Sequence, residues 1–281
     1  MKQRSFKQVD VFSAEHYRGN PVAVVLEGQD LSTADMQRFA RWTNLSETTF
    51  ILPPTTPDAD YRLRIFTPAR ELPFAGHPTL GSCHAWLEAG GHPRTDHEVV
   101  QECQVGLVRI KRDPTRLAFA APAPLRTGAV DADTLDRIVR SLGITTADVL
   151  HHQWTDTGPG WVTVMLPSAE AVLRLEPRYD LMQGLEVGVV GAYPEGSECQ
   201  FEVRAFITIG TPVAYEDPVT GSLNAGIGQW LTSAGLSEQQ YVASQGTALG
   251  RSGRVHVERD ANGQVWVGGD TVTCISGTVS L

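Results

Sequence analysis

Two stretches of the sequence decide the predicted fold: Arg64–Ser82, RIFTPARELPFAGHPTLGS, and Arg204–Ser222, RAFITIGTPVAYEDPVTGS. In each, a strand ending in Arg-x-Phe leads to a segment rich in Gly, Pro and Ser, and the shared residues recur at an offset of 140. Because 140 is about half of the 281 residues, the sequence predicts a duplicated fold. In this alignment His77 of one copy falls on Asp217 of the other.

The repeat extends well beyond these stretches. The β-branched run Pro21–Leu26 matches Trp161–Leu166 at the same offset, and both suit buried strands. Strand-rich halves that each carry one helix of small residues predict the α+β class, with two similar domains facing each other. We expect an N-terminal half over 1–121, completed by the last strand at about 270–281, and a C-terminal half over 125–269.

Local signals place the other elements. Ser32 is expected to cap a helix that ends near Trp42, and Asp131 or Asp133 a helix that ends at Leu142. Val99–Lys111 is predicted to be a strand.

Composition limits the function. A net charge of −9 and a pI near 5.4 disfavour nucleic acid as a partner, because binding phosphates needs clustered Lys and Arg. No apolar run reaches the roughly 20 residues that span a bilayer, so a membrane protein is not expected. The four cysteines are scattered and no secretory leader is visible, so we expect a cytoplasmic protein without disulfides.

The two Gly/Ser-rich turns that lead into helices could bind an anion. Backbone N–H groups and the positive end of the helix dipole suit a carboxylate there. The alternative is that the glycines and serines only allow capping and close packing. The titratable residues at matching positions, His77 and Asp217, favour a ligand site. Glu47 allows two readings as well: a solvated strand position, or a carboxylate in an apolar cleft with a raised pKa that takes and returns a proton.

Three motifs in order carry a family resemblance: Asn44–Phe50, NLSETTF; Phe74–Thr79, FAGHPT; and Glu216–Ser222, EDPVTGS. Together with Gly19–Val24, GNPVAV, they resemble the PhzF family of phenazine-biosynthesis isomerases over essentially the whole chain. The resemblance implies the diaminopimelate-epimerase-like fold: two pseudo-symmetric domains, each a curved, mostly antiparallel sheet around a central helix, with the active site between them. It also implies a cofactor-free homodimeric isomerase acting on a small carboxylate-bearing metabolite.

The resemblance also implies residue roles. Glu47 would be the general acid and base, and His77 and Asp217 would hold polar groups of the substrate and tune the proton transfer. The substrate's carboxylate would be gripped by residues at the helix starts, with a further hydroxyl beside Glu47: Gly76, Gly221, Ser222 and Ser46. Related epimerases of this fold use a cysteine at each helix start. Cys83 lies one turn inside its helix, where a buried core residue is the simpler reading.

Other readings stay open. His151-His152 is disfavoured as a metal site because neighbours on a strand point apart, and Gly250–Arg254 fits an anion loop or a plain hairpin. Pocket walls are expected from Gly19–Asn20, Thr67–Leu72 and Ile209–Tyr215. The alternative functions are a non-catalytic carboxylate-binding protein and an amino-acid epimerase with bases other than cysteine. The substrate cannot be read from the sequence.

Overall fold

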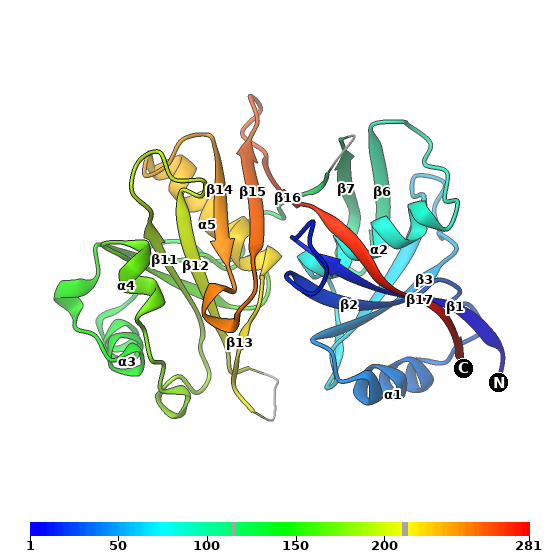
Figure 1. Cartoon of the computed structure of the whole chain (residues 1–281), viewed down its shortest axis with the longest axis horizontal. Helices are drawn as coiled ribbons and strands as arrows, with labels where there is room; N and C mark the ends of the chain where they lie inside the picture. Colours follow the sequence, from blue (N-terminus) through cyan, green and yellow to red (C-terminus); the bar gives the residue numbers. More distant parts are fainter. Residues whose placement is uncertain (114–115, 210–212) are drawn as a thin grey trace. The chain divides into compact units, whose positions relative to one another are not determined.

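The structure is a computed structural model that describes residues 1–113, 116–209 and 213–281 (Figure 1). Contacts divide the chain into two compact units: unit 1 is Met1–Ala120 with Gly268–Leu281, and unit 2 is Ala121–Val267. Residues 210–212 of the predicted pocket wall Ile209–Tyr215 lie outside the described residues. No helix in the described ranges is long and apolar enough to cross a membrane.

Unit 1 is a sheet with two helices. Its elements are β1 (Gln3–Val11), β2 (Asn20–Val25), α1 (Thr33–Thr43), β3 (Glu47–Leu52), β4 (Tyr61–Phe66), β5 (Glu71–Leu72), α2 (Gly76–Glu88), β6 (Glu98–Cys103), β7 (Gly106–Arg112), β8 (Leu117–Ala120) and β17 (Thr271–Ser280). β16 (Val265–Gly269) crosses the boundary between the units. The first and last strands pair antiparallel, so the two chain ends lie together in this unit (Figure 1).

Unit 2 contains α3 (Ala132–Leu142), η1 (Thr146–Asp148), β9 (His151–Trp154), β10 (Trp161–Leu166), α4 (Ala169–Leu173), η2 (Tyr179–Leu181), β11 (Glu186–Ala192), β12 (Phe201–Ile207), β13 (Tyr215–Asp217), α5 (Gly221–Ala234), β14 (Gln240–Gln245), η3 (Thr247–Leu249) and β15 (Gly253–Arg259). Its pairings repeat those of unit 1. β10 is parallel to β11 as β2 is to β3, and β12 is parallel to β14 as β4 is to β6.

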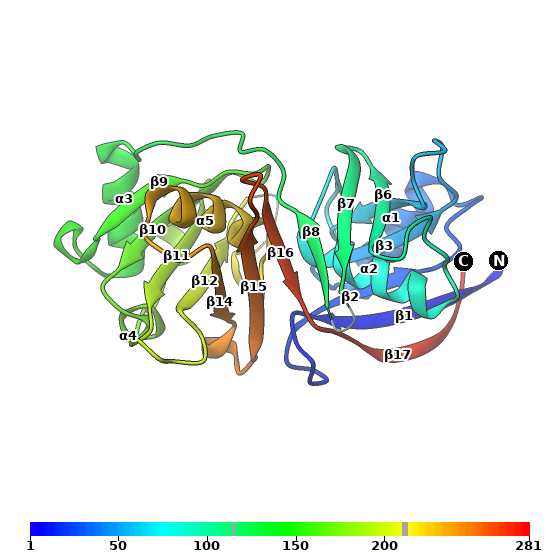
Figure 2. The same ribbon diagram turned by 90° about the horizontal axis from the view of Figure 1, so that it is seen from above.

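Both long inner helices are buried, and glycine allows their close approach to the strands. A Cβ on Gly81 of α2 would lie 2.4 Å from Val22 Cγ1 on β2, and one on Gly226 of α5 would lie 2.0 Å from the Thr155 carbonyl oxygen. α5 also packs against β15 and β10 (Figure 2). The α+β class and the helices of small residues at the centre of each half, both predicted from the sequence, are confirmed.

Several local predictions can be scored. Ser32 caps α1 by accepting from the Asp35 N–H, and Asp131, not Asp133, caps α3 by accepting from the Thr134 N–H. The single strand predicted over Val99–Lys111 is wrong in one respect. It is a hairpin of β6 and β7, because Gly106 adopts a positive φ of 102° that turns the chain.

The alignment of the two helix starts at an offset of 140 is also wrong. Arg64 and Arg204 do correspond, but Glu71 and Glu216 face the matching residues Phe66 and Phe206 at an offset of 145. Likewise Asp217 pairs with Ala205 as Leu72 pairs with Ile65. The β12–β13 connection is longer, so the helix starts Gly76-His77 and Gly221-Ser222 correspond to each other. The structural counterpart of His77 is Ser222.

Candidate functional site

The predicted acid/base residue Glu47 lies at the start of β3 in unit 1. β3 runs parallel to β2 with Glu47 beside Val22, and Thr49 ties β3 to α2 through a 2.8 Å contact between its Oγ1 and Ser82 Oγ. Gly81 lets α2 approach Val22 closely. These contacts bring the first turn of α2 next to the first residue of β3.

This packing places His77 beside Glu47. Nε2 of His77 lies 3.3 Å from Oε2 of Glu47, and the two side chains are only 6% and 14% exposed. Burial lowers the pKa of His77 to about 3, although a hydrogen bond to the Pro21 carbonyl raises it in part. The imidazole is therefore neutral at physiological pH, and its contact with Glu47 is a polar contact between a carboxyl group and a neutral ring rather than an ion pair.

Asn20, the first residue of β2, is buried on the other side of the imidazole. Its Nδ2 lies 3.4 Å from His77 Nδ1, and its Oδ1 accepts a 3.4 Å hydrogen bond from Ser46 Oγ. The donor and acceptor roles in the contact between Asn20 and Nδ1 depend on the tautomer of the imidazole. Ser46, predicted as a hydroxyl beside Glu47, is thus joined to His77 through Asn20.

The predicted residues of unit 2 form a second cluster at the start of α5. Buried Asp217 accepts a 2.6 Å hydrogen bond from Thr220 Oγ1. Gln245, fully buried on β14, donates to Thr220 Oγ1 and to the Asp217 carbonyl, and it accepts from the Thr220 N–H. This amide fixes both the Asp217 segment and the turn into α5, and the sequence analysis missed it because the spacing of Gln245 carries no motif.

Neither helix start is capped by a side chain. The N-cap residues Ala75 and Thr220 make no side-chain capping hydrogen bond, and neither first turn contains an acidic residue. Gly76 and Gly221 are the first residues of α2 and α5, and both are buried. First-turn N–H groups with no capping side chain are suited to an anionic group, and binding of one at these positions stays a prediction.

The Arg-x-Phe repeat that opened the sequence analysis has a structural role. Arg64 donates two hydrogen bonds to Glu71 and lies over the Phe66 ring. Arg204 does the same with Glu216 and Phe206. In each unit this ion pair closes the hairpin that precedes the inner helix.

The prediction that Cys83 is a buried core residue is confirmed. Cys83 is fully buried in α2, and burial raises the pKa of its thiol to about 12, so it is a core residue and not a nucleophile. His152 on β9 accepts from the Val130 N–H through Nδ1. No group of three or more possible metal-binding side chains occurs among the residues that the structure describes.

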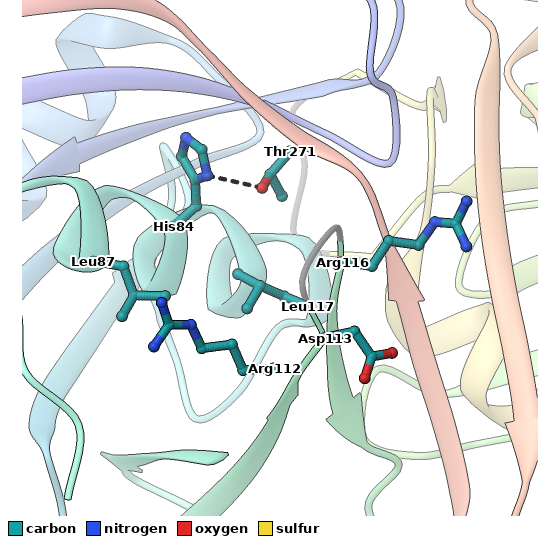
Figure 3. A pocket seen from close by; sticks show the side chains of 7 residues that line it. All are labelled: His84, Leu87, Arg112, Asp113, Arg116, Leu117 and Thr271. Atoms are coloured by element: carbon teal, nitrogen blue, oxygen red, sulfur yellow. Dashed lines mark hydrogen bonds between the residues drawn. The ribbon is translucent and has the colours of Figure 1, made fainter. Parts of the chain in front are cut away.

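A pocket of about 240 Å³ lies elsewhere in unit 1, around the later turns of α2 (Figure 3). It is lined by His84, Leu87, Arg112, Asp113, Arg116, Leu117 and Thr271. His84 Nδ1 is 2.9 Å from Thr271 Oγ1, and Arg116 Nε is 3.4 Å from a carboxylate oxygen of Asp270. None of the predicted site residues lines it.

The fold places the protein in the α+β class, and comparison with known proteins specifies the family. Residues 9–277 match the family described as "Phenazine biosynthesis-like protein" (PhzC-PhzF), to which the chain belongs. The prediction of a PhzF-family protein is confirmed.

Individual relatives agree. The chain is 38% identical to antisense-enhancing sequence 1 of Schizosaccharomyces pombe, covering 99% of both chains. It is 32% identical to trans-2,3-dihydro-3-hydroxyanthranilate isomerase of Pseudomonas chlororaphis, covering 97% of this chain and 98% of the relative. A PhzF-family crystal structure from Bacillus anthracis superimposes with a TM-score of 0.85 at 22% identity, covering 100% of both chains, which supports the fold. The enzyme class expected from the sequence, an isomerase, is the class named for the relative from Pseudomonas chlororaphis and for a further relative from Pasteurella multocida, to which the chain is 30% identical over 95% of its length and 91% of the relative.

Proposed function

We propose that the protein is a cofactor-independent isomerase that moves a proton on a small carboxylate-bearing metabolite, with Glu47 as general acid and base. The observation that carries the proposal is the buried contact between Glu47 and neutral His77. A carboxylate in such a place takes a proton as a substrate C–H bond breaks, and returns it as a C–H bond forms at another carbon. No electrons are gained or lost, so one base completes the reaction.

The other predicted residues support this chemistry as substrate-holding groups. His77 keeps the Glu47 carboxyl group oriented. Gly76, Gly221 and Ser222 are proposed to hold the carboxylate through the donors of the helix starts, and Asp217 to hold a further polar group. The relative from Pseudomonas chlororaphis is named as an isomerase of trans-2,3-dihydro-3-hydroxyanthranilate, an amino acid with a ring carboxylate. This compound is therefore the first substrate to test.

The test compares turnover of this compound by the wild type, Glu47→Gln and Glu98→Gln, followed by NMR. Glu98 pairs with Arg109 at the surface of the β6–β7 hairpin and serves as the matched control. We expect Glu47→Gln to lose about 100- to 10,000-fold in kcat, which is the usual contribution of general acid and base catalysis, with substrate affinity kept. Normal turnover by Glu47→Gln would contradict the mechanism. No turnover by the wild type would contradict the proposed substrate.

The homodimer stays a prediction. Light scattering coupled to size-exclusion chromatography tests it, with a mass of twice 30.5 kDa as the expected result.

A further inference from the structure

The side chain of Ser222 at the start of α5 is held in an unusual way. Its Oγ accepts a 3.0 Å hydrogen bond from the indole Nε1 of Trp161, at the start of β10. Its carbonyl accepts a 3.1 Å hydrogen bond from Thr157 Oγ1. Trp161 is 1% exposed, so the indole is fixed by its packing in the core of unit 2.

These contacts determine what the hydroxyl can do. An indole N–H can only donate, and a serine hydroxyl has one hydrogen and two acceptor lone pairs. With one lone pair occupied by Trp161, the hydroxyl hydrogen is directed away from the indole. Ser222 is only 9% exposed, yet within the described ranges no group accepts this hydrogen. Burying a hydrogen-bond donor without an acceptor costs free energy, unless a bound ligand supplies the acceptor.

The surroundings add donors of the same kind. Ser222 is the second residue of a 14-residue helix whose N-cap, Thr220, makes no side-chain capping hydrogen bond. The first-turn N–H groups of Gly221 and Ser222 belong to the same helix start as the hydroxyl. Donors from backbone and side chain at the positive end of a helix dipole suit the two oxygens of a carboxylate.

We infer that Trp161 is a positioning residue that makes Ser222 a dedicated hydrogen-bond donor to the carboxylate of the substrate. The inference rests on the proposed function in taking Ser222 as a carboxylate-holding residue. The matching position of β2 in unit 1 is Pro21, which has no side-chain donor and cannot make the hydrogen bond that Trp161 makes. At the corresponding helix position unit 1 carries His77 instead of a serine.

The test is a double-mutant cycle on binding of benzoate, with benzamide as the neutral isostere, followed by NMR titration. A hydrogen bond to a charged group contributes about 1.5 to 3 kcal/mol, so we expect Ser222→Ala to weaken benzoate binding about 10-fold or more. Trp161→Phe keeps an aromatic ring but removes the N–H. We expect it to weaken benzoate binding about 3-fold, because the orientation of the Ser222 hydroxyl is no longer fixed by the indole. In the Ser222→Ala background, Trp161→Phe should have no further effect.

The matched control is Trp266→Phe, which removes the indole hydrogen bond to Asp260 in the same unit and should leave benzoate affinity unchanged. The inference is overturned if Trp161→Phe weakens binding equally with and without Ser222, if Trp266→Phe has the same effect, or if benzoate binds no more tightly than benzamide. Since the assay measures binding and not turnover, it can succeed even if the Glu47 mechanism fails. Circular dichroism and thermal melts establish that each variant folds.

Discussion

The duplicated Arg–Glu pair gives a sharp prediction about stability. Glu216→Gln and Glu71→Gln remove the same charge from matching positions, but the two ion pairs differ in burial. The Arg204 and Glu216 side chains are each 5% exposed, whereas those of Arg64 and Glu71 are 21% and 17% exposed. Removing one partner of a buried pair leaves an uncompensated charge, and this cost depends on how well water can reach it.

The expected losses of unfolding free energy follow from the surroundings of each arginine. Arg204 keeps two carbonyl acceptors, on Val172 and Leu175, and the glutamine keeps one oxygen. We therefore expect Glu216→Gln to cost about 3 kcal/mol, the lower end for a broken buried pair. Because Arg64 is partly hydrated, Glu71→Gln should cost about 1 kcal/mol. At about 2 to 4 °C per kcal/mol for a unit of this size, the melting temperature falls about three times further for Glu216→Gln.

Urea unfolding followed by circular dichroism and by tryptophan fluorescence measures both variants. The double variant Arg204→Met/Glu216→Leu removes both charges and should recover most of the lost stability. The reasoning is refuted if Glu216→Gln costs no more than Glu71→Gln. It is also refuted if the double variant is as unstable as Glu216→Gln.

Three further predictions follow from burial. The His77 ring should stay neutral from pH 5 to 8 and titrate near its pKa of about 3, so an NMR titration that finds it charged at pH 6 would be contrary evidence. Burial raises the pKa of Glu202, so its contribution to stability is present below pH 4 and is lost as the pH rises through the folded-state pKa. Glu202→Gln should therefore raise the melting temperature at pH 7 but not at pH 3.5, and equal shifts at both would refute this. Gly226→Ala should destabilise by about 3 kcal/mol, at the upper end for overpacking, and more than Gly81→Ala. The reason is that a Cβ at position 226 would meet a backbone oxygen, whereas a Cβ at position 81 would meet side-chain methyl groups. Chemical denaturation of the two variants ranks their free energies of unfolding.

Much of the fold could be predicted because the relevant signals are local. Alternating and β-branched runs marked the strands, and Ser32 marked a helix start through its own hydrogen bond. The family motifs singled out Glu47 and His77 but not the contact between them, which depends on Gly81 letting α2 approach the strands closely.

The correspondence of the two helix starts could not be predicted in the same way. Gly, Pro and Ser recur at an offset of 140 by letter, but strand register decides which residues are equivalent. The strand pairing shows that the second hairpin is longer, because Leu72 pairs with Ile65 whereas Asp217 pairs with Ala205. His77 therefore corresponds to Ser222. The bond from Trp161 to Ser222 depends on that register as well, because it joins residues 61 positions apart.

The central claim is that Glu47 carries a proton between two carbons of the substrate. Deuterium incorporation into trans-2,3-dihydro-3-hydroxyanthranilate in D₂O, followed by NMR and mass spectrometry, tests it most directly. The account predicts deuterium at a ring carbon of the product with the wild type, and none with Glu47→Gln although the compound still binds. Incorporation by Glu47→Gln at the wild-type rate would contradict it.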